Sequence, residues 1–361
     1  MNLLLCLSLQ FLLATCSVIR ETDDEDNTEL MVLPPGLVPR ASMREVFRDE
    51  FNYVDRNKWS LDASASMGWF SMYTPEQRNC YTHGGTIYLK PTLTADRFGE
   101  NFLHNSVLDI KKLYGYCDPT WNNGCYRDPH KDGINPVAMS CFMRSKFSFK
   151  YGKMEIVAKM PKGDWLWPAL WLFPKHGHYG EWPRSGEIDV AEITGNVNYG
   201  GLGVHRQSAS LHFGNDRAHD HHIVNHKTLQ GTTWGDAFHK YTLDWTSSHI
   251  NIYIDGQMML STPMPGDGLH HHYHLPGNNI WGNSHNAPFD QDFYIIMSNG
   301  VGGGGIFPDN VRNYPHPKPW SVHDSRRDGM EKFWRHKNDW YQTWHGEDPA
   351  LQVRSVVVWQ Y

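Results

Sequence analysis

The stretch Ser185–Ile193 reads SGEIDVAEI and places three carboxylates, Glu187, Asp189 and Glu192, in an otherwise apolar run. Alternate residues of a regular strand face one way, so Glu187 and Asp189 share a face while Glu192 points to the opposite one. An unpaired carboxylate inside a core is costly. A one-residue β-bulge near Val190–Ala191 would remove the conflict and bring all three carboxylates to one surface. The stretch therefore predicts a bulged β-strand with an acidic face.

Two carboxylates at this spacing suit the hydrolysis of a glycosidic bond. With the bulge, the backbones of Glu187 and Glu192 lie about four strand steps apart, roughly 13 Å. Their side chains can close that distance to the ~5–5.5 Å of a retaining glycosidase. Crowding separates their pKa values, so that one stays ionised as a nucleophile and the other keeps a proton near neutral pH. Asp189 can orient the nucleophile. An arbitrary Glu-x-Asp-x-x-Glu is more often a solvated sheet rim, so the surrounding sequence has to decide.

The stretch upstream, residues 163–174, reads GDWLWPALWLFP. As a strand it has two faces, with Trp165, Trp167, Ala169 and Trp171 on one and Leu166, Pro168, Leu170 and Leu172 on the other. The aliphatic face suits a core, and the indole face suits the flat side of a sugar ring. A Trp stripe at this spacing can also be core.

Short alternating runs separated by turn residues continue from about residue 44. The clearest is His249–Gly256, where three isoleucines share one face ahead of an Asp-Gly turn. Met154–Met160 and Val353–Trp359 also read as strands. Many short strands with turns between them indicate an antiparallel sandwich or barrel. One segment, 323–345, has apolar residues at spacings of three, four and seven and predicts one surface helix or two short ones packed on the sheet.

The composition excludes several classes of protein. The 361 residues fit one large domain or two small ones, and the 40% apolar content supports a substantial core. The net charge is -6 without a basic run, so we expect no nucleic-acid partner. No segment is long enough for a membrane helix, so we expect no membrane partner. The run Gly302–Gly305 lacks the Lys-Ser/Thr of a phosphate loop and predicts a turn where the backbone passes close to another group.

The N-terminal residues predict export. Met1–Ala14 contains an apolar run with the length of a signal-peptide core, followed by small residues at 14 and 16, although no basic residue precedes Arg20. We expect residues 1–16 to be a signal peptide, 17–44 an acidic and Pro-rich linker or pro-segment, and 45–361 a single domain of a secreted protein.

Four cysteines follow the predicted signal peptide, and an even number in a secreted chain favours two disulfides. Three pairings are possible. Cys117 and Cys125 flank a turn rich in Asn, Pro and Gly, so a local bridge is the first choice, which leaves Cys80 with Cys141. A zinc site is the rival interpretation, but no C-x-x-C pair is present. The His-rich stretches near 219–222 and 270–274 could bind a transition metal, although exposed His-rich loops are commoner, and we predict no metal and no cofactor.

These motifs together resemble glycoside hydrolase family 16, especially its animal laminarinase and β-1,3-glucan-recognition branch. The resemblance covers about residues 46–361 and rests on WPALW at 167–171, WPRSGEIDVAE at 182–192, GN at 195–196, LHFG at 211–214 and FHKYTLDW at 238–245. It implies an all-β fold: a β-jelly-roll of two curved antiparallel sheets with a concave substrate cleft and a few short surface helices. It also implies retaining hydrolysis.

The resemblance assigns roles by motif position. It implies Glu187 as nucleophile, Asp189 as its helper and Glu192 as general acid/base, with the Asp189-to-Glu192 spacing of the bulged, laminarinase-like type. It further suggests the sugar-binding residues Trp167, Trp171 and Arg184, with His212 near the leaving-group side. The chain departs from the family pattern at Phe142, where relatives usually have Arg, at 297–303, and at Arg354, where calcium-binding members commonly have Asp, so we expect no calcium.

We therefore expect a secreted, monomeric endo-β-1,3-glucanase, or glucan endo-1,3-β-D-glucosidase, acting on β-1,3-glucan polysaccharide or oligosaccharide by double displacement. Two alternatives share the fold. A non-catalytic β-1,3-glucan pattern-recognition lectin typically has its glutamates replaced, whereas both are present here. A transglycosylase would pass the glycosyl unit to a sugar in place of water.

Overall fold

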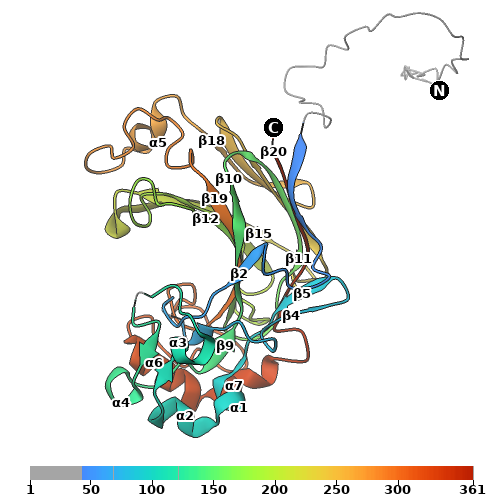
Figure 1. The fold of residues 1–361 in the computed structure, drawn as a ribbon, viewed down its shortest axis with the longest axis vertical. Coiled ribbons are helices and arrows are strands. Elements are labelled where there is room, and N and C mark those ends of the chain that lie inside the picture. Colours follow the sequence, from blue (N-terminus) through green and yellow to red (C-terminus); the bar gives the residue numbers. More distant parts are fainter. Residues whose placement is uncertain (1–42, 68, 121, 361) are drawn as a thin grey trace, which may run out of the picture. The chain divides into compact units, whose positions relative to one another are not determined.

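The computed structural model describes residues 43–67, 69–120 and 122–360, which belong to one compact unit spanning Ala41–Tyr361 (Figure 1). The predicted signal peptide, 1–16, and all but the last two residues of the predicted linker, 17–44, lie outside the described residues. No helix in the described part of the chain is long and apolar enough to cross a membrane.

Two large antiparallel sheets form the body of this unit. The outer sheet runs in the order β18 (Gln257–Pro263), β17 (His249–Ile254), β16 (His239–Trp245), β11 (Gly152–Lys159), β20 (Leu351–Gln360), β5 (Thr86–Leu89) and β4 (Cys80–His83), with β1 (Arg44–Asp49) paired to β20. The inner sheet runs in the order β15 (Asp220–Thr228), β14 (Arg206–Gly214), β13 (Glu187–Glu192), β12 (Leu166–Pro174), β19 (Phe293–Val301), β10 (Phe142–Phe149) and β2 (Trp59–Leu61). The predicted strands at 154–160, 249–256 and 353–359 are thus confirmed as β11, β17 and β20.

The main core lies between the two sheets because alternate residues of facing strands are apolar. The burial pattern of β11 alternates strictly, with Met154, Ile156 and Ala158 buried. Leu170 and Leu172 of β12 belong to the same core. The opposite face of the inner sheet, which we call the open face, carries the partly exposed side chains of β12 and β13.

The short helices mostly gather at one end of the sheets, whereas α5 (Gly268–His272) lies at the other end (Figure 1). They are α1 (Thr94–Phe98), α2 (Glu100–Asn105), α3 (Ile110–Tyr114), α4 (Pro129–Asp132), α6 (Arg326–Arg335) and α7 (Lys337–Trp340). The described residues also include the single-turn 3-10 helices η2 (Arg217–His219) and η3 (Tyr341–Thr343). The predicted all-β sandwich with short helices is therefore confirmed.

Two small sheets accompany the helices. One joins β3 (Ser71–Tyr73), β9 (Ala138–Ser140) and β6 (Thr92–Leu93), and the other joins β7 (Leu108–Asp109) and β8 (Tyr126–Arg127). Both large sheets are antiparallel as predicted, whereas the pair β3–β9 of the first small sheet is parallel. The two strands of this pair are separated by more than sixty residues of helices and loops, which leaves room for the crossover that parallel pairing needs.

The helical prediction for 323–345 is confirmed as α6 and α7 followed by η3. Ser325 begins α6 by accepting a hydrogen bond from the backbone N–H of Asp328 (3.1 Å), as an N-cap should. The buried side chains of these helices lie in a second apolar core with Phe70, Trp165 and Trp320. The helices therefore pack chiefly on this second core and only at its border on the strands of the inner sheet.

Trp165 corrects the predicted Trp stripe. Its φ of 67° is left-handed, so the strand alternation begins only at Leu166. The backbone N–H of Trp165 donates to the side-chain oxygen of Asn196 (3.0 Å), and the ring is 1% exposed against Tyr199 and Trp320. Trp165 is therefore a core residue and does not share the open face with Trp167 and Trp171.

The predicted close approach at Gly302–Gly305 is confirmed. A Cβ on Gly302, whose φ is 59°, would lie 2.4 Å from the ring of Phe70, and one on Gly304 would lie 2.9 Å from the ring of Trp69. The turn needs glycine because only a residue without Cβ fits against these rings.

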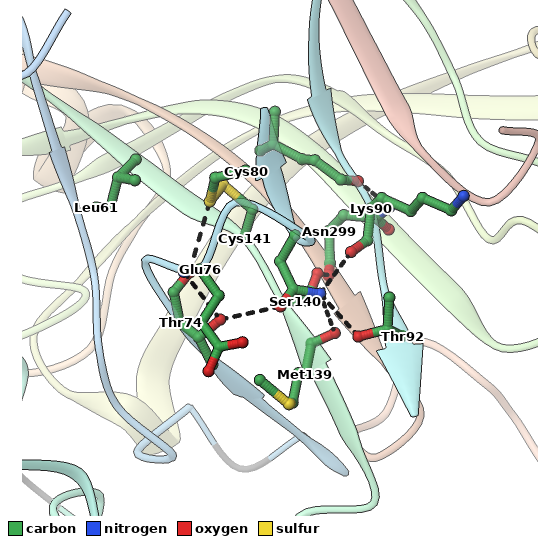
Figure 2. Close-up of a disulfide and its surroundings, with 12 residues drawn as sticks. Leu61, Thr74, Glu76, Cys80, Lys90, Thr92, Met139, Ser140, Cys141 and Asn299 are labelled. Carbon is green, nitrogen blue, oxygen red and sulfur yellow. Dashed lines mark hydrogen bonds between the residues drawn. A yellow bond between two sulfur atoms is a disulfide. The ribbon is translucent and has the colours of Figure 1, made fainter. Parts of the chain in front are cut away.

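The structure contains the two disulfides Cys80–Cys141 and Cys117–Cys125, the pairing chosen from the sequence. Cys80–Cys141 joins β4 of the outer sheet to the residue before β10 of the inner sheet. Figure 2 shows the hydrogen bonds around it, including the one from Ser140 Oγ to the carbonyl of Asn299 (2.5 Å). The side chain of Asn299 donates in turn to the carbonyl of Leu89 in β5 (3.0 Å). The two large sheets are thus joined beside strand β19 by the disulfide and by the hydrogen bond from Asn299 to Leu89.

Candidate active site

The predicted bulge lies in β13. Asp189 and Glu192 are three residues apart, yet their partners on β12, Trp171 and Ala169, are only two apart. Their partners on β14 are also two apart, because Asp189 pairs with Ser210 and Glu192 pairs with Ser208. Residues two apart on a regular strand share a face, so the extra residue of β13 brings Asp189 and Glu192 to the same side.

The acidic triad, by which we mean Glu187, Asp189 and Glu192, lies on the open face. Glu187 and Glu192 are partly exposed, whereas Asp189 is 2% exposed. Asp189 accepts a hydrogen bond from Ser210 Oγ (2.7 Å), and Glu192 accepts one from the indole N–H of Trp167 (3.0 Å). Asp189 and Glu192 are therefore each held by the backbone of β13 and by one donor on a neighbouring strand.

Burial and crowding raise the pKa of every member of the triad. Burial, followed by the negative charge of Glu192, raises the pKa of Glu187 to about 8. Burial raises the pKa of Asp189 well above its ordinary value, and the charges of Glu187 and Glu192 add to the effect. Burial also raises the pKa of Glu192, against the hydrogen bond from Trp167, which lowers it. The triad therefore binds protons up to higher pH than isolated carboxyl groups do, and its three members affect one another's ionisation.

His212 lies beside the triad on β14, directly opposite Glu187. Its Nε2 is 3.5 Å from Oδ2 of Asp189, and its Nδ1 is 2.8 Å from Oδ2 of Asp220. Burial lowers the pKa of His212, but the hydrogen bond to Asp220 and the charge of Asp189 raise it by more, so its pKa lies above the ordinary value. The imidazolium form is thus favoured next to the acidic groups.

The open face of β12 carries the two indoles that the resemblance suggested as sugar-binding. Trp167 and Trp171 are partly exposed, whereas Leu166, Leu170 and Leu172 point into the core. Trp171 donates its indole N–H to Ser298 Oγ (3.2 Å) on β19. The two rings therefore flank the triad on one side with fixed orientations.

Arg184 lies in the loop before β13, three residues ahead of Glu187. Its side chain is exposed and its Nε donates to the carbonyl of Asn215 (2.7 Å). The same loop borders a hollow of about 340 Å³ whose lining includes Trp182, Ser185 and Gly186, next to the first residue of β13. The structure therefore places Arg184 in the loop that borders this hollow and brings Trp167, Trp171 and His212 to the triad itself.

Phe142, the departure from the family pattern on β10, lies within an apolar cluster of the open face. It is 4% exposed and its ring is 4.9 Å from Tyr73 and 5.9 Å from Trp171, measured between centroids. The next residue on the same side of the strand, Arg144, binds the buried carboxylate of Asp62 (2.7 Å). Position 142 of the open face is therefore apolar where the family pattern would put a cation, and the charge of the nearby Arg144 is paired with Asp62.

Arg354, at the position linked to calcium in some relatives, points away from the core on β20, with its guanidinium 3.7 Å from the ring centroid of Phe238. His219 and His271 of the two His-rich stretches are each paired with one aspartate, Asp216 and Asp267. The described part of the chain has no group of three or more His, Cys, Asp or Glu that could hold a metal ion.

Several residues of the site were not predicted from the sequence. Asp220, Ser210 and Ser298 reach it because of strand register, which a single sequence does not reveal. Trp182 lies in the quoted motif, and its ring is 5.8 Å from that of His212. Asp220 lies between histidines in a stretch that was interpreted as a His-rich loop and is the edge strand β15.

The chain is similar to known proteins over most of its length. Residues 101–278 match the family described as glycosyl hydrolases family 16. A β-1,3-glucan-binding protein from Penaeus monodon is 36% identical over 87% of this chain and 90% of its own length. β-1,3-glucan-binding protein 1 from Manduca sexta is 30% identical over 90% of this chain and 66% of its own length. Glucan endo-1,3-β-glucosidase A1 from Niallia circulans is 28% identical over 80% of this chain and 38% of its own length.

Solved structures share the fold. The laminarinase from Rhodothermus marinus aligns with a TM-score of 0.54 at 21% identity, over 88% of this chain and 97% of that one. A LamA variant from Z. galactanivorans, solved in complex with laminaritriose and laminaritetraose, aligns with a TM-score of 0.53 at 19% identity, over 88% of this chain and 98% of that one. The predicted jelly-roll is thus confirmed, and with it the resemblance: the chain belongs to glycosyl hydrolase family 16.

Proposed function

We propose that this protein is a secreted endo-β-1,3-glucanase that hydrolyses laminarin-type glucans with retention of configuration. The single observation that carries the proposal is the bulge of β13, which sets Glu187 and Glu192 on one open face beside two partly exposed indoles. Two glutamates on one face with raised pKa values are typical of a catalytic pair, which supports hydrolysis over binding alone.

The chemistry follows from the two glutamates on one face. A protonated Glu192 carries no negative charge, so it no longer opposes the ionisation of Glu187. Glu187 then attacks the anomeric carbon while Glu192 protonates the leaving oxygen, which gives a glycosyl-enzyme. Glu192, now ionised, takes a proton from water as the intermediate is hydrolysed. The carboxylates thus change roles without an added cofactor.

The other residues of the open face have supporting roles in this proposal. Asp189, which accepts a hydrogen bond from Ser210, helps to orient Glu187. The rings of Trp167 and Trp171 stack on glucose units of the chain, and His212 lies on the side of the leaving group. Arg184, in the loop beside the hollow, contacts sugar hydroxyls at greater distance from the reacting bond.

A second function, binding of β-1,3-glucan without hydrolysis, is favoured by one observation. The relatives from Penaeus monodon and Manduca sexta are both called β-1,3-glucan-binding proteins, and the first of them covers nearly the whole of this chain. In that case the open face would hold the glucan and the triad would contribute hydrogen bonds alone.

The deciding experiment is reducing-sugar release from laminarin by the purified protein, with Glu192→Gln as the matched control. Hydrolysis that the variant loses, with β-configured first products in NMR spectra, is the expected result. Laminarin binding without release of reducing ends would overturn the enzyme in favour of the binding protein. Products longer than the substrate at high acceptor concentration would instead identify a transglycosylase.

A further inference from the structure

Asp220 lies outside the acidic triad and is linked to it through the imidazole ring of His212. It is the first residue of β15, the edge strand of the inner sheet, and precedes His222, the cross-strand partner of His212, by two positions. Residues two apart share a face, so Asp220 lies on the open face with His212. Its Oδ2 is 2.8 Å from Nδ1 of His212, and its side chain is only 16% exposed.

The carboxylate of Asp220 has few other interaction partners. Its second oxygen, Oδ1, is buried and has no hydrogen-bond partner among the described residues. A buried carboxylate without other donors interacts strongly with the one cation that it contacts. His212 is that cation when both ring nitrogens carry protons.

The charged and titratable groups that face His212 come from three elements of the fold. They are Glu187, Asp189 and Glu192 from β13, Asp220 and His222 from β15, and Arg217 of η2 through the ring of Trp182. The carboxylates favour the charged imidazole, whereas His222 and Arg217 would oppose it. Among the carboxylates, only Asp220 lies on the Nδ1 side, away from the triad.

We propose that Asp220 is a positioning residue that keeps His212 charged and aimed at Asp189, so that the imidazolium offsets the negative charge of the triad. The proposal rests on the proposed function for its catalytic consequence. With Nδ1–H directed at Asp220, the Nε2–H of the same ring faces the triad over the 3.5 Å to Asp189. Asp220 thus acts through His212 and does not contact the reacting atoms.

The experiment is an NMR titration of the His212 ring in the full chain, with laminarin hydrolysis measured in parallel. The signal is assigned by its absence in His212→Gln. Asp220→Asn keeps an acceptor of the same shape and removes the charge. We expect the His212 midpoint to move to lower pH in Asp220→Asn and kcat on laminarin to fall roughly 10-fold, a small part of what a general acid contributes.

The matched control is Asp216→Asn. Asp216 lies in the same segment as Asp220, and its Oδ1 is 2.9 Å from Nδ1 of the exposed His219, so the variant removes a similar carboxylate–imidazole pair. We expect it to leave both the His212 midpoint and kcat unchanged. An unchanged midpoint in Asp220→Asn, or an equal shift in Asp216→Asn, would overturn the proposal. A shift specific to Asp220→Asn in a protein that does not hydrolyse laminarin would overturn the proposed function and still support the pairing of Asp220 with His212.

Discussion

The indole N–H of Trp167 donates a hydrogen bond to Oε1 of Glu192 over 3.0 Å. This bond fixes one oxygen of the carboxylate on the side of β12 and leaves the other for a ligand on the open face. Because the donor favours the ionised form, it opposes the effect of burial on the pKa of Glu192. One Trp therefore sets both the orientation and the acidity of the proposed acid/base.

Replacing Trp167 with Phe keeps an aromatic ring and removes the donor. We expect the pKa of Glu192 to rise, which moves the alkaline limb of the pH profile on laminarin to higher pH, and kcat/KM to fall about 10-fold, or ~1.4 kcal/mol. The control is Trp171→Phe, because the indole of Trp171 donates to Ser298 and not to the triad. A limb that moves equally in both variants would show that Trp167 acts through the shape of the site alone.

Glu187→Gln should stabilise the protein, and more so at alkaline pH. In the unfolded chain the carboxyl has its ordinary pKa of 4.5, whereas in the folded protein burial and the negative charge of Glu192 raise that pKa to about 8. The folded state thus binds more protons in this window, and stability falls as pH rises from 4.5 to 8. Glutamine does not ionise and avoids that loss. Because Glu187 is partly exposed, we expect a gain of about 1–2 kcal/mol.

The measurement is thermal unfolding of both proteins at pH 5 and pH 8. The midpoint of Glu187→Gln should exceed that of the unaltered protein by about 2–4 °C at pH 8 and by less at pH 5. A constant difference between the two pH values would contradict a raised pKa for Glu187.

Trp165, which precedes β12, and Trp171, on its open face, lie in different environments and should respond differently to replacement. Trp165 is 1% exposed in the second core, so Trp165→Ala should cost about 3–5 kcal/mol of unfolding free energy. Trp171 is partly exposed on the open face, so Trp171→Ala should cost less stability and weaken laminarin binding by about 10-fold or more. Urea unfolding and isothermal titration with laminarin-derived oligosaccharides measure the two effects. Equal losses of stability would contradict the assignment of Trp165 to the core.

The two disulfides should contribute unequally to stability. Cys80–Cys141 closes a loop of 61 residues, whereas Cys117–Cys125 closes one of 8. The longer loop gains more from cross-linking the unfolded chain, so the double Ala variant at Cys80 and Cys141 should lose about 3–4 kcal/mol and the variant at Cys117 and Cys125 about 2 kcal/mol. Urea unfolding under non-reducing conditions measures both. A reversed order would indicate that the local bridge supports more structure than its own loop.

The sequence predicted those parts of the site that follow from alternation along one strand. Glu192 lies an odd number of residues after Glu187 and Asp189, so a regular strand would turn it to the opposite face. This spacing alone required a bulge in β13, and the structure contains one. Alternation failed at Trp165 because a left-handed residue interrupts the strand there, and nothing in the run of Trp and Leu marks that interruption. Asp220 was not found because its contact with His212 depends on how β15 aligns with β14. Local patterns therefore predicted the triad, and register between strands decides what surrounds it.

The link between the sheets at Cys80–Cys141 and Asn299 affects the cost of binding a ligand. The disulfide and the hydrogen bond from Asn299 to Leu89 link the inner sheet to the outer one beside β19, and Ser140 ties β9 to the same strand, which restricts movement of the floor of the open face relative to the outer sheet. A binding surface that is already ordered before the ligand arrives loses little conformational entropy on binding. The ordering cost of the complex then falls mainly on the flexible polysaccharide, and segments of it that already have the matching curvature should be favoured.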